Sequence, residues 1–438
     1  MNSEDALLEA WEKTLARKAD APAIFDTRGE RLRTFLDIEE QARLLEAEVA
    51  KSDVYPIALG NHPDWPATLL ACLRKQVIAL PLDESTTEQQ RHAALQMCAG
   101  ANWGEHRPVL LKLTSGTTAA PRAIRFRSEQ LLADCEQICA TMGITEADLN
   151  FGVIPVSHSY GLSNLITPLI VRGVPMVVSR DRMPRALVDD LARTQATVFP
   201  GMPVFFQALS EMPSPPSLPR LRLCMSAGAP LPLPVARKFR ERFGLAIHSF
   251  YGSSECGGIC YDRAARLEEQ GFVGQPMKGV TVKFQESDGA GSQIEVHSAA
   301  AGDGYFPESN EEKLRPGRFV PDDLLSRSAE GFRIVGRVSD VINVAGKKVH
   351  PASVEAVLLA CEGVREAVVF ARESVARNEE VAACVVPAAG TVEADVLDFC
   401  RQRLSGWQVP KRIFFVSELP VNERGKISRR DLAQRFHA

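Results

Sequence analysis

The apolar residues in the N-terminal part of the chain alternate between extended and helical spacing. Short, nearly continuous apolar runs, typical of buried strands, occur at residues 22–26, 54–59 and 77–83. Before and between these runs, apolar residues recur every three or four positions, as on one face of a helix. The helical positions are Leu7, Leu8, Trp11 and Leu15 in the first segment and Ile38, Ala42, Leu45 and Val49 in the second. Strands and helices in alternation predict βαβ units and a mostly parallel sheet.

The alternation continues through the middle of the chain. Further apolar runs predict strands at residues 109–114, 151–156, 174–178, 197–199, 221–225 and 246–250, separated by helical segments such as 129–142. Turns of small and polar residues follow three of these strands, with the sequences SHSYG (157–161), SAGAP (226–230) and YGSSECGG (251–258). Because ligands of open α/β sheets bind at the carboxyl ends of the strands, we expect these turns to converge on one site.

The pattern changes near Phe272, where short strands and glycine turns predict an antiparallel subdomain. The last segment, of about 100 residues, has its own pattern, with helices predicted at 351–360 and 394–404 and strands at 367–371 and 381–387. We therefore predict an α/β fold in two domains. Residues 1–338 form a large domain of parallel-rich sheets with helices plus the small antiparallel subdomain, and residues 339–438 form a small, mobile α+β domain.

Composition and charge exclude several classes of protein. A chain of 438 residues is too long for a single core and fits two or three domains. A net charge of −4, with basic residues dispersed, argues against a nucleic-acid partner. No apolar segment is long enough to span a membrane, and the acidic start is unlike a secretory leader. Ten cysteines without a CxxC pair predict reduced thiols in a cytoplasmic protein and no structural zinc site.

Candidate chemistry begins in the stretch Leu113 to Arg122, LTSGTTAAPR. A strand leads into Ser115, Gly116, Thr117 and Thr118, and Arg122 closes the loop. Backbone N–H groups, hydroxyls and a cation in so short a stretch predict a clamp for a nucleotide triphosphate. The spacing differs from GxxxxGK[ST], so the common P-loop fold is not implied. On this motif alone, a Ser/Thr-rich surface turn is an equally good interpretation.

Five stretches together resemble the acyl-adenylate-forming (AMP-binding) superfamily, which includes acyl- and aryl-CoA synthetases, adenylation domains of peptide synthetases, and luciferases. They are LTSGTTAAPR, SAGAPLP, FYGSSE, PDDL followed by GFRIVGRVSDVINVAGKKVHPASVE, and LPVNERGKISR. They occur in the family's order and cover nearly the whole chain. The resemblance is greatest to the acyl- and aryl-CoA synthetases. It implies that a small carboxylic acid reacts with ATP, in the presence of Mg²⁺, and that the acyl group then passes to CoA or a phosphopantetheine carrier protein.

The resemblance also assigns the nucleotide-binding residues. ATP would be bound by Thr114, Ser115, Gly116, Thr117, Thr118, Arg122, Gly228, Ala229, Pro230, Tyr251, Gly252, Ser254, Asp323 and Arg337. Within this set, Tyr251 would stack on adenine and Asp323 would accept both ribose hydroxyls. Glu255 would hold Mg²⁺, a hard cation that prefers a carboxylate and phosphate oxygens. Taken alone, these residues also fit a core tyrosine, a surface ion pair of Asp323 with Arg337, and a solvated carboxylate.

The catalytic residues implied by the resemblance are Lys426, Glu255, Thr118 and His158. Lys426 would reach the α-phosphate and the acid's carboxylate when the small domain closes. Out of its RGKISR context it is one of 51 basic residues, most of them expected in solvent. A hinge near Ser339 would then exchange Lys426 for the loop of Gly346, which would line the tunnel for the thiol.

The acid pocket implied by the resemblance comprises His158, Ser159, Phe250, Gly252 and Gly257. Amino-acid-activating relatives carry an aspartate near His158 to pair the α-amine, and this turn has none. Phe250 stands where roomier relatives have a small residue, so we expect a short pocket. The substrate is therefore expected to be an aryl or a short-to-medium acyl acid. Alternatively, His158 is a hydrogen-bonded histidine at a strand end.

Several positions depart from the family pattern. Ala119 stands where glycine is usual, Arg122 replaces lysine, and Ser254 replaces threonine; Pro321 and Asp322 replace Thr and Gly ahead of Asp323. None of these changes removes a required charge, so we expect an active ligase. Two alternatives stay open: a stand-alone adenylation domain for a peptide synthetase, and a nucleotide-binding homologue that has lost catalysis.

Overall fold

The computed structural model of this chain describes residues 5–104, 106–114, 122–265, 269–285, 291–374, 378–420 and 429–436. Its contacts divide the chain into two compact units. The first comprises Met1–Lys283, Glu295–Val320 and Ala329–Phe332, and the second comprises Phe284–Ile294, Pro321–Ser328 and Arg333–Ala438. The domain border expected at residues 338 and 339 stays a prediction.

The main sheet of the first unit has the strand order β2, β1, β8, β7, β9, β10, β11, β12, β13. Its strands are β1 (Pro22–Phe25), β2 (Arg31–Thr34), β7 (Asn150–Gly152), β8 (Met176–Val178), β9 (Val198–Gly201), β10 (Leu223–Ser226), β11 (Ile247–Ser253), β12 (Gly257–Tyr261) and β13 (Phe272–Pro276). From β1 to β11 each neighbouring pair is parallel, as predicted. Antiparallel pairs lie at both ends of this series. The sequence analysis missed β2, whose residues RLRT carry little apolar signal.

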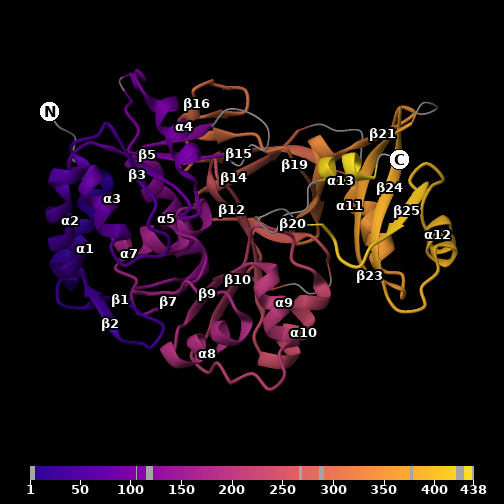
Figure 1. Cartoon of the computed structure of the whole chain (residues 1–438), viewed down its shortest axis with the longest axis horizontal. Helices are drawn as coiled ribbons and strands as arrows, with labels where there is room; N and C mark the ends of the chain where they lie inside the picture. Colours follow the sequence, from indigo (N-terminus) through magenta and orange to yellow (C-terminus); the bar gives the residue numbers. More distant parts are fainter. Residues whose placement is uncertain are drawn as a thin grey trace. The chain divides into compact units, whose positions relative to one another are not determined.

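Helices pack on the sheets of the first unit (Figure 1), and those at residues 88–98 and 159–172 were not predicted. They are α1 (Ala6–Lys18), α2 (Phe35–Val49), α3 (Trp65–Arg74), α4 (Glu88–Cys98), α5 (Ser128–Met142), α6 (Ser159–Gly161), α7 (Thr167–Arg172), α8 (Pro184–Thr194), α9 (Pro203–Glu211) and α10 (Leu233–Phe243), with a π-helical turn at Leu162–Ile166. The Asp5 carboxylate starts α1 by accepting the N–H groups of Leu7 and Leu8. Trp11 and Trp65 are fully buried in the core beneath these helices.

A second sheet of the first unit has the order β16, β6, β5, β4, β3. Its strands are β3 (Val54–Ile57), β4 (Ile78–Pro81), β5 (Leu110–Leu113), β6 (Ala123–Phe126) and β16 (Gly304–Phe306). Strands β3, β4 and β5 are parallel, as predicted, but β5 and β6 form an antiparallel hairpin. The Thr114 N–H donates to the Arg122 carbonyl at 2.8 Å and closes that hairpin. The expected triphosphate clamp is therefore the hairpin's connection, and β6 was missed.

The antiparallel subdomain is confirmed by short strands. They are β14 (Val280–Phe284), β15 (Ser292–Ser298), β17 (Leu314–Arg315), β18 (Arg318–Phe319), β19 (Asp323–Ser328) and β20 (Gly331–Arg337). Strand β15 pairs antiparallel with β18 and with β19. The positive φ of its glycine turns, for example +76° at Gly317, suits the tight connections that these short strands need.

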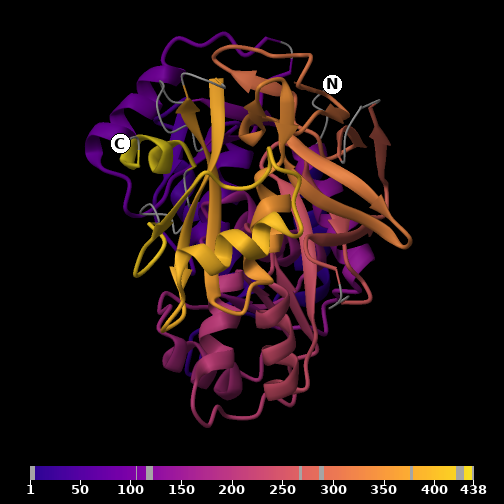
Figure 2. The same ribbon diagram turned by 90° about the vertical axis from the view of Figure 1, so that its right-hand side faces the viewer.

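The second unit contains a separate small sheet, drawn in orange and yellow in Figure 2. Strand order is β22 (Lys347–Val349), β21 (Ile342–Val344), β24 (Asn378–Pro387) and β23 (Val364–Ser374), and β25 (Arg412–Phe415) pairs with β24. Alternate residues of β23 and β24 face two different apolar clusters. Helices α11 (Pro351–Leu359) and α12 (Glu393–Arg401) contribute to one cluster, and α13 (Arg429–Arg435) contributes to the other. The predicted α+β pattern of this segment is confirmed.

One ion-pair network holds the start of α13 in this unit. The Arg429 guanidinium contacts Asp340 at 2.5 Å and Glu355 at 2.8 Å, and its Nε donates to the Val369 carbonyl at 2.9 Å. Asp340 ends the one-turn helix Val338–Asp340, which contains the expected hinge residue Ser339.

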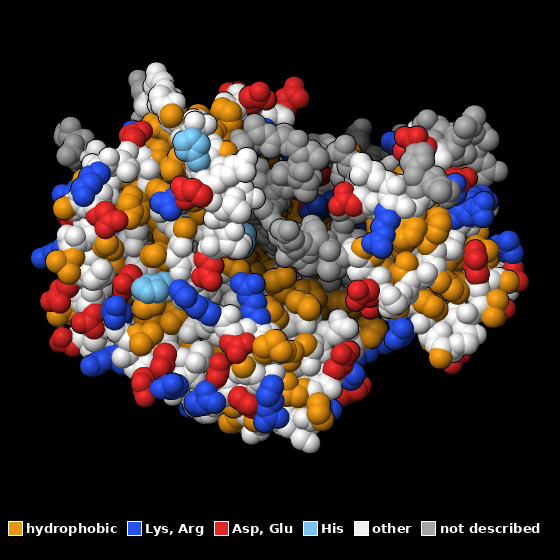
Figure 3. All heavy atoms as spheres, in the orientation of Figure 1, with side chains coloured by type: hydrophobic (Ala, Val, Ile, Leu, Met, Phe, Trp, Pro, Cys, Tyr) orange, Lys and Arg blue, Asp and Glu red, His pale blue; other side chains and the backbone are white. Residues whose placement is uncertain are grey.

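Three further features concern the surface charges, the cysteines and the lengths of the helices. On the face drawn in Figure 3, acidic and basic side chains are interspersed over the described surface. All ten cysteines are free thiols, and nine of them are buried. Among the helices of the described residues, none is both long and apolar enough to cross a membrane.

Candidate active site

The carboxyl ends of the parallel strands β7, β9, β10 and β11 lie along one edge of the main sheet. Tyr160, in the short helix α6 after β7, donates its hydroxyl to the carbonyls of Gly201 and Met225, each at 3.2 Å. Gly201 ends β9 and Met225 lies near the end of β10. The segment SHSYG, expected as a turn but helical from Ser159, therefore contacts the ends of both strands, as expected for segments that converge at this edge.

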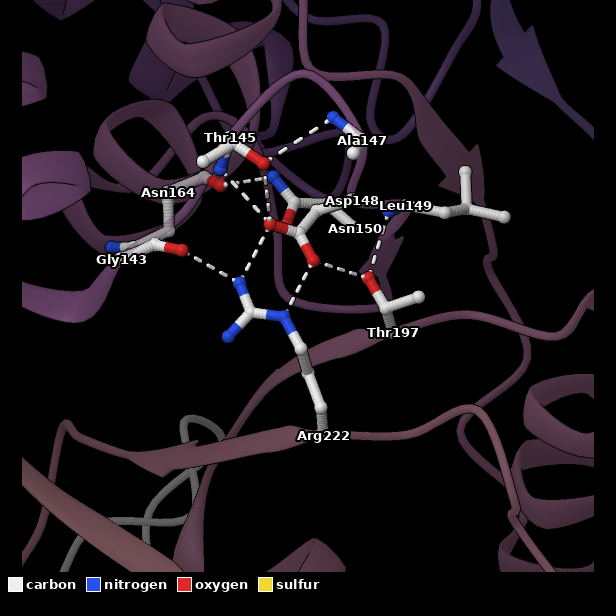
Figure 4. Close-up of polar contacts among 9 residues, drawn as sticks. All are labelled: Gly143, Thr145, Ala147, Asp148, Leu149, Asn150, Asn164, Thr197 and Arg222. Carbon is white, nitrogen blue, oxygen red and sulfur yellow. Dashed lines mark hydrogen bonds and ion pairs between the residues drawn. The ribbon is translucent and has the colours of Figure 1, made fainter.

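The opposite edge carries a polar network instead (Figure 4). The Arg222 guanidinium donates to both oxygens of Asp148, at 2.7 and 2.6 Å, and Thr197 Oγ1 donates to Asp148 at 2.8 Å. Burial tends to raise the pKa of Asp148, but the bonds from Arg222, Thr145 and Thr197 hold it below its usual value. Asp148, Thr197 and Arg222 precede β7, β9 and β10, respectively. This network therefore connects the amino ends of the three strands. The adjoining hollow of about 450 Å³ is thus at the edge away from the loops.

The turn between β11 and β12 is shorter than the sequence suggested. The expected turn over residues 251–258 is wrong in extent, because Tyr251 and Gly252 continue β11 and pair with Cys260 and Gly258 of β12. Only Ser254 to Cys256 form the turn. Ser253 Oγ accepts the N–H groups of Glu255 and Cys256, each at 3.2 Å, and so fixes the turn that presents Glu255.

Asp134 of α5 fastens the start of β12 behind this turn. Its buried carboxylate accepts the N–H of Gly258 at 2.9 Å and the hydroxyl of Ser163 at 2.5 Å. At Gly257, where φ is +66°, an added Cβ would lie 2.0 Å from the Asp134 carboxylate, so only glycine fits. The sequence analysis did not identify Asp134, because nothing in the sequence of an amphipathic helix distinguishes a buried carboxylate from a solvated one.

The Glu255 carboxylate lies against Tyr305. The Tyr305 hydroxyl donates to Glu255 Oε1 at 3.1 Å. Burial raises the pKa of Glu255 above its usual value, while the hydrogen bonds to its backbone N–H, Tyr305 and Ser253 and the charge of Lys313 act the other way. The guanidinium of Arg122 lies over the Tyr305 ring, 3.8 Å from its centroid. One tyrosine therefore contacts both the carboxylate expected to hold Mg²⁺ and the cation expected to bind phosphate.

Lys112 is a buried cation in this region. It lies on β5 within the apolar run VLLKL, and its ammonium is 4.2 Å from the centroid of the Phe126 ring. Burial lowers the pKa of Lys112, and the negative charges of Asp134 and Glu255 oppose that shift. A lysine inside an apolar strand was the signal in the sequence that could have drawn attention to it.

The residues expected to line the acid pocket lie at this same edge. His158 Nε2 is 3.5 Å from a carboxylate oxygen of Asp83, two residues after β4. Phe250 is 7% exposed and its ring centroid is 5.8 Å from that of Tyr160. A Cβ added at Gly258 would lie 3.0 Å from the Phe250 ring, so Phe250 packs directly on β12. Ser159 is half-buried and Gly252 is exposed beside them.

The expected nucleotide residues divide between the two units. In the first unit, Gly228, Ala229 and Pro230 form an exposed loop after β10, Tyr251 is buried and Ser254 is half-buried. In the second unit, Asp323 and Arg337 form an ion pair at 2.7 Å, and Gly346, with φ +84°, donates its N–H to Asn343 at 2.9 Å. Ser115, Gly116, Thr117, Thr118 and Lys426 lie outside the described residues.

Glu255 fits the requirements of Mg²⁺ better than those of a fully protein-bound metal. Within the described part of the chain, no three His, Cys, Asp or Glu side chains gather as a metal site. Mg²⁺ in nucleotide sites takes one or two carboxylates together with phosphate oxygens. A single, half-buried carboxylate such as Glu255 matches that pattern.

Family models, related sequences and solved structures all give matches to this chain. Residues 96–297 match the family "AMP-binding enzyme", and residues 353–426 match "AMP-binding enzyme C-terminal domain". The chain is 28% identical to a 3,4-dihydroxybenzoate–[aryl-carrier protein] ligase of Bacillus anthracis, over 75% of this chain and 74% of that protein. It is 27% identical to a feruloyl-CoA synthase of Amycolatopsis sp, over 92% and 84%. The fold matches ATP-bound MatB from Rhodopseudomonas palustris with a TM-score of 0.85, at 22% identity over 98% of both chains.

Proposed function

This chain belongs to the acyl-adenylate-forming family of AMP-binding enzymes, and on that premise we propose that it joins a small carboxylic acid to a thiol through an acyl-AMP. The observation that carries the proposal is that one aromatic side chain, Tyr305, contacts both the Glu255 carboxylate and the guanidinium of Arg122, which directly precedes the second strand of the hairpin. A half-buried carboxylate and a cation brought together in this way suit a metal-bound triphosphate.

In the proposed first step, an oxygen of the substrate carboxylate attacks the α-phosphorus of ATP. The new bond joins that oxygen to phosphorus, and the bond to the bridging oxygen breaks as pyrophosphate leaves. Bound Mg²⁺ would neutralise phosphate charge. Arg122 holds the phosphate end of the nucleotide, and the residues around Tyr251 and Gly228 to Pro230 hold the adenine. Lys426 and Thr118 are proposed to contact the α-phosphate, because catalysis of phosphoryl transfer depends on positioning and charge stabilisation.

In the proposed second step, a thiol sulfur attacks the carbonyl carbon of the acyl-AMP. A thioester forms, the bond to the phosphate oxygen breaks, and AMP leaves. CoA and the pantetheine arm of a carrier protein share this thiol chemistry, and the names of the two relatives include both acceptors. Gly346 is proposed to line the path of the thiol, and Ser339 to lie at the hinge between the two conformations.

We propose an aryl or short-to-medium acid as the substrate. Phe250 and Tyr160 place two aromatic rings next to each other at the expected pocket, which favours a flat, apolar group of limited length. His158 is held beside Asp83 at the expected acid site. The two curated relatives act on aromatic acids according to their names. Free, mostly buried thiols support the proposal of a cytoplasmic protein.

The proposal is tested by acid-dependent ATP–pyrophosphate exchange. The panel contains benzoates, cinnamates, short and medium fatty acids, malonate and amino acids, and each is measured with wild type and Glu255→Gln. Exchange with aryl or short acyl acids, lost in Glu255→Gln, supports the proposal. Nucleotide binding without exchange on any acid would identify a homologue that has lost catalysis and would overturn the enzyme assignment.

The acceptor is tested with the acids that support exchange. Consumption of CoA supports a CoA ligase, whereas acylation of a phosphopantetheinylated carrier protein alone supports carrier loading. Exchange with amino acids only would favour the stand-alone adenylation domain and would contradict the proposed substrate class.

A further inference from the structure

We propose that Tyr305 is a positioning residue. It holds the carboxylate of Glu255 and the guanidinium of Arg122 in a fixed arrangement, so that the metal-binding and phosphate-binding groups act together. The inference rests on the proposed function, because it assigns a task to a residue at the same site. The Tyr305 hydroxyl contacts Glu255, and the face of its ring contacts Arg122.

The position of Tyr305 is set by strand β16. Tyr305 pairs with Ile124 of β6, so it sits on the strand next to the hairpin that carries the clamp loop. The N–H of Gly302, which precedes β16, donates to the Glu255 carbonyl at 2.9 Å. A Cβ at Gly302 would lie 2.7 Å from the Ile124 side chain, so glycine allows this close approach. The backbone of residues 302–305 therefore bridges the hairpin and the Glu255 turn.

The Tyr305 side chain completes the bridge. Its hydroxyl donates to Glu255 Oε1 at 3.1 Å, while its ring face lies 3.8 Å from the Arg122 guanidinium carbon. A planar guanidinium stacks on an aromatic face, which a lysine ammonium does less well. The arginine at a position where relatives carry lysine is thus matched by the tyrosine beneath it. Arg122 Nε is buried and has no hydrogen-bond partner among the described residues, so the stacked ring is a contact that helps to orient the guanidinium.

The two contacts have separate electrostatic effects. A hydroxyl that donates to a buried carboxylate stabilises its charged form, which is the form that binds a cation. A cation over the ring face is attracted by the ring quadrupole, which holds Arg122 in place. Among the described residues, the charges of Lys313 and Lys112 also interact with that of Glu255. These groups stay unchanged when only the Tyr305 hydroxyl is removed.

Two substitutions separate the two contacts. Tyr305→Phe removes the hydroxyl and keeps the ring, and Tyr305→Leu removes both. Tyr55→Phe is the matched control, because the Tyr55 hydroxyl donates to the Glu48 carboxylate at 2.7 Å on another part of the first unit. A fluorescent ATP analogue measures nucleotide affinity in Mg²⁺ and in EDTA. Thermal melting confirms that each variant is folded.

Tyr305→Phe is expected to bind nucleotide in EDTA as tightly as wild type does. The increase in nucleotide affinity on adding Mg²⁺ should be roughly tenfold smaller in this variant than in wild type. Tyr305→Leu is expected in addition to bind nucleotide a few-fold more weakly than wild type in EDTA, because the ring beneath Arg122 is lost. In an Arg122→Ala background, the difference in EDTA between the Phe and Leu variants should vanish.

The outcomes separate this inference from the proposed function. If wild type binds no nucleotide, the proposed function fails first. If wild type binds nucleotide and Tyr305→Phe gains as much nucleotide affinity on adding Mg²⁺ as the Tyr55→Phe control does, the Tyr305 inference is overturned while the function stands. Equal effects of the Phe and Leu variants in EDTA would likewise overturn the role of the ring.

Discussion

Arg337 donates from its Nε to the Asp323 carboxylate across 2.7 Å, inside the second unit. Asp323 begins β19 and Arg337 ends β20. The Arg337 side chain is 61% exposed and that of Asp323 is 14% exposed, so water screens much of their attraction. Such a pair is expected to stabilise the fold little. We propose that it serves mainly to orient Asp323 and Arg337 for the ribose.

Arg337→Ala therefore separates stability from binding. We expect the free energy of unfolding to change by less than about 1 kcal/mol, as for other exposed pairs. The KM for ATP should rise roughly tenfold, since a charge-assisted contact to the nucleotide is lost. Chemical denaturation and exchange kinetics give the two values. Arg185→Ala is the control, because it breaks an exposed pair with Asp189 at 2.8 Å on α8. An unchanged KM would contradict the ribose assignment.

Phe250 is expected to limit the size of the acid. Phe250→Ala removes the ring that faces Tyr160, so kcat/KM for longer or bulkier acids should rise relative to that for benzoate-sized acids. Loss of a buried phenylalanine should also cost about 3 kcal/mol of unfolding free energy. Phe239→Ala, at a fully buried position of α10, should cost a similar amount without changing the preference among acids. The same change in preference in both variants would show that Phe250 acts only through stability.

Lys426 is proposed to serve the first half-reaction alone. Lys426→Ala should abolish pyrophosphate exchange, because the α-phosphate loses a positive partner. Thioester formation from supplied acyl-AMP should stay close to wild type, since Gly346 and not Lys426 is assigned to that step. Lys411→Ala, an exposed lysine of the second unit, is the control. Equal loss of both half-reactions would argue against two alternating conformations.

Lys112 should make the free energy of unfolding depend on pH in the alkaline range. Burial lowers the pKa of this lysine in the folded chain. Between that lowered value and about 10.4, the value in an unfolded chain, the unfolded state binds more protons. Stability must then rise with pH in that window. We expect wild type to gain stability there relative to Lys112→Met, as measured by chemical denaturation at a series of pH values.

The comparison of wild type with Lys112→Met cancels the tyrosines and cysteines that titrate in the same window. Lys278→Met, at an exposed position, should follow the wild-type curve. Identical pH slopes for wild type and Lys112→Met would mean that Lys112 titrates alike in the folded and unfolded chain, against the expected effect of burial.

The sequence by itself determined the alternation of strands and helices, the parallel sheets and the family. These follow from periodic burial of apolar residues and from short motifs whose partners are adjacent in the chain. The strands that it missed have little such signal: β2 reads RLRT, and β6 is a short run broken by Arg125. Their pairing depends on a neighbouring strand rather than on their own pattern.

Only the tertiary structure decided how the site is assembled. The bond of Tyr305 to Glu255 joins residues 50 positions apart, and that of Gly258 to Asp134 joins residues 124 apart. A hydrogen bond or cation–π contact stabilises only at short range and in the right orientation, which residue order does not reveal. The clamp motif, Glu255 and Arg122 were therefore recognisable in the sequence, whereas the tyrosine that connects them became visible only when the hairpin and the β11 to β12 turn were folded together.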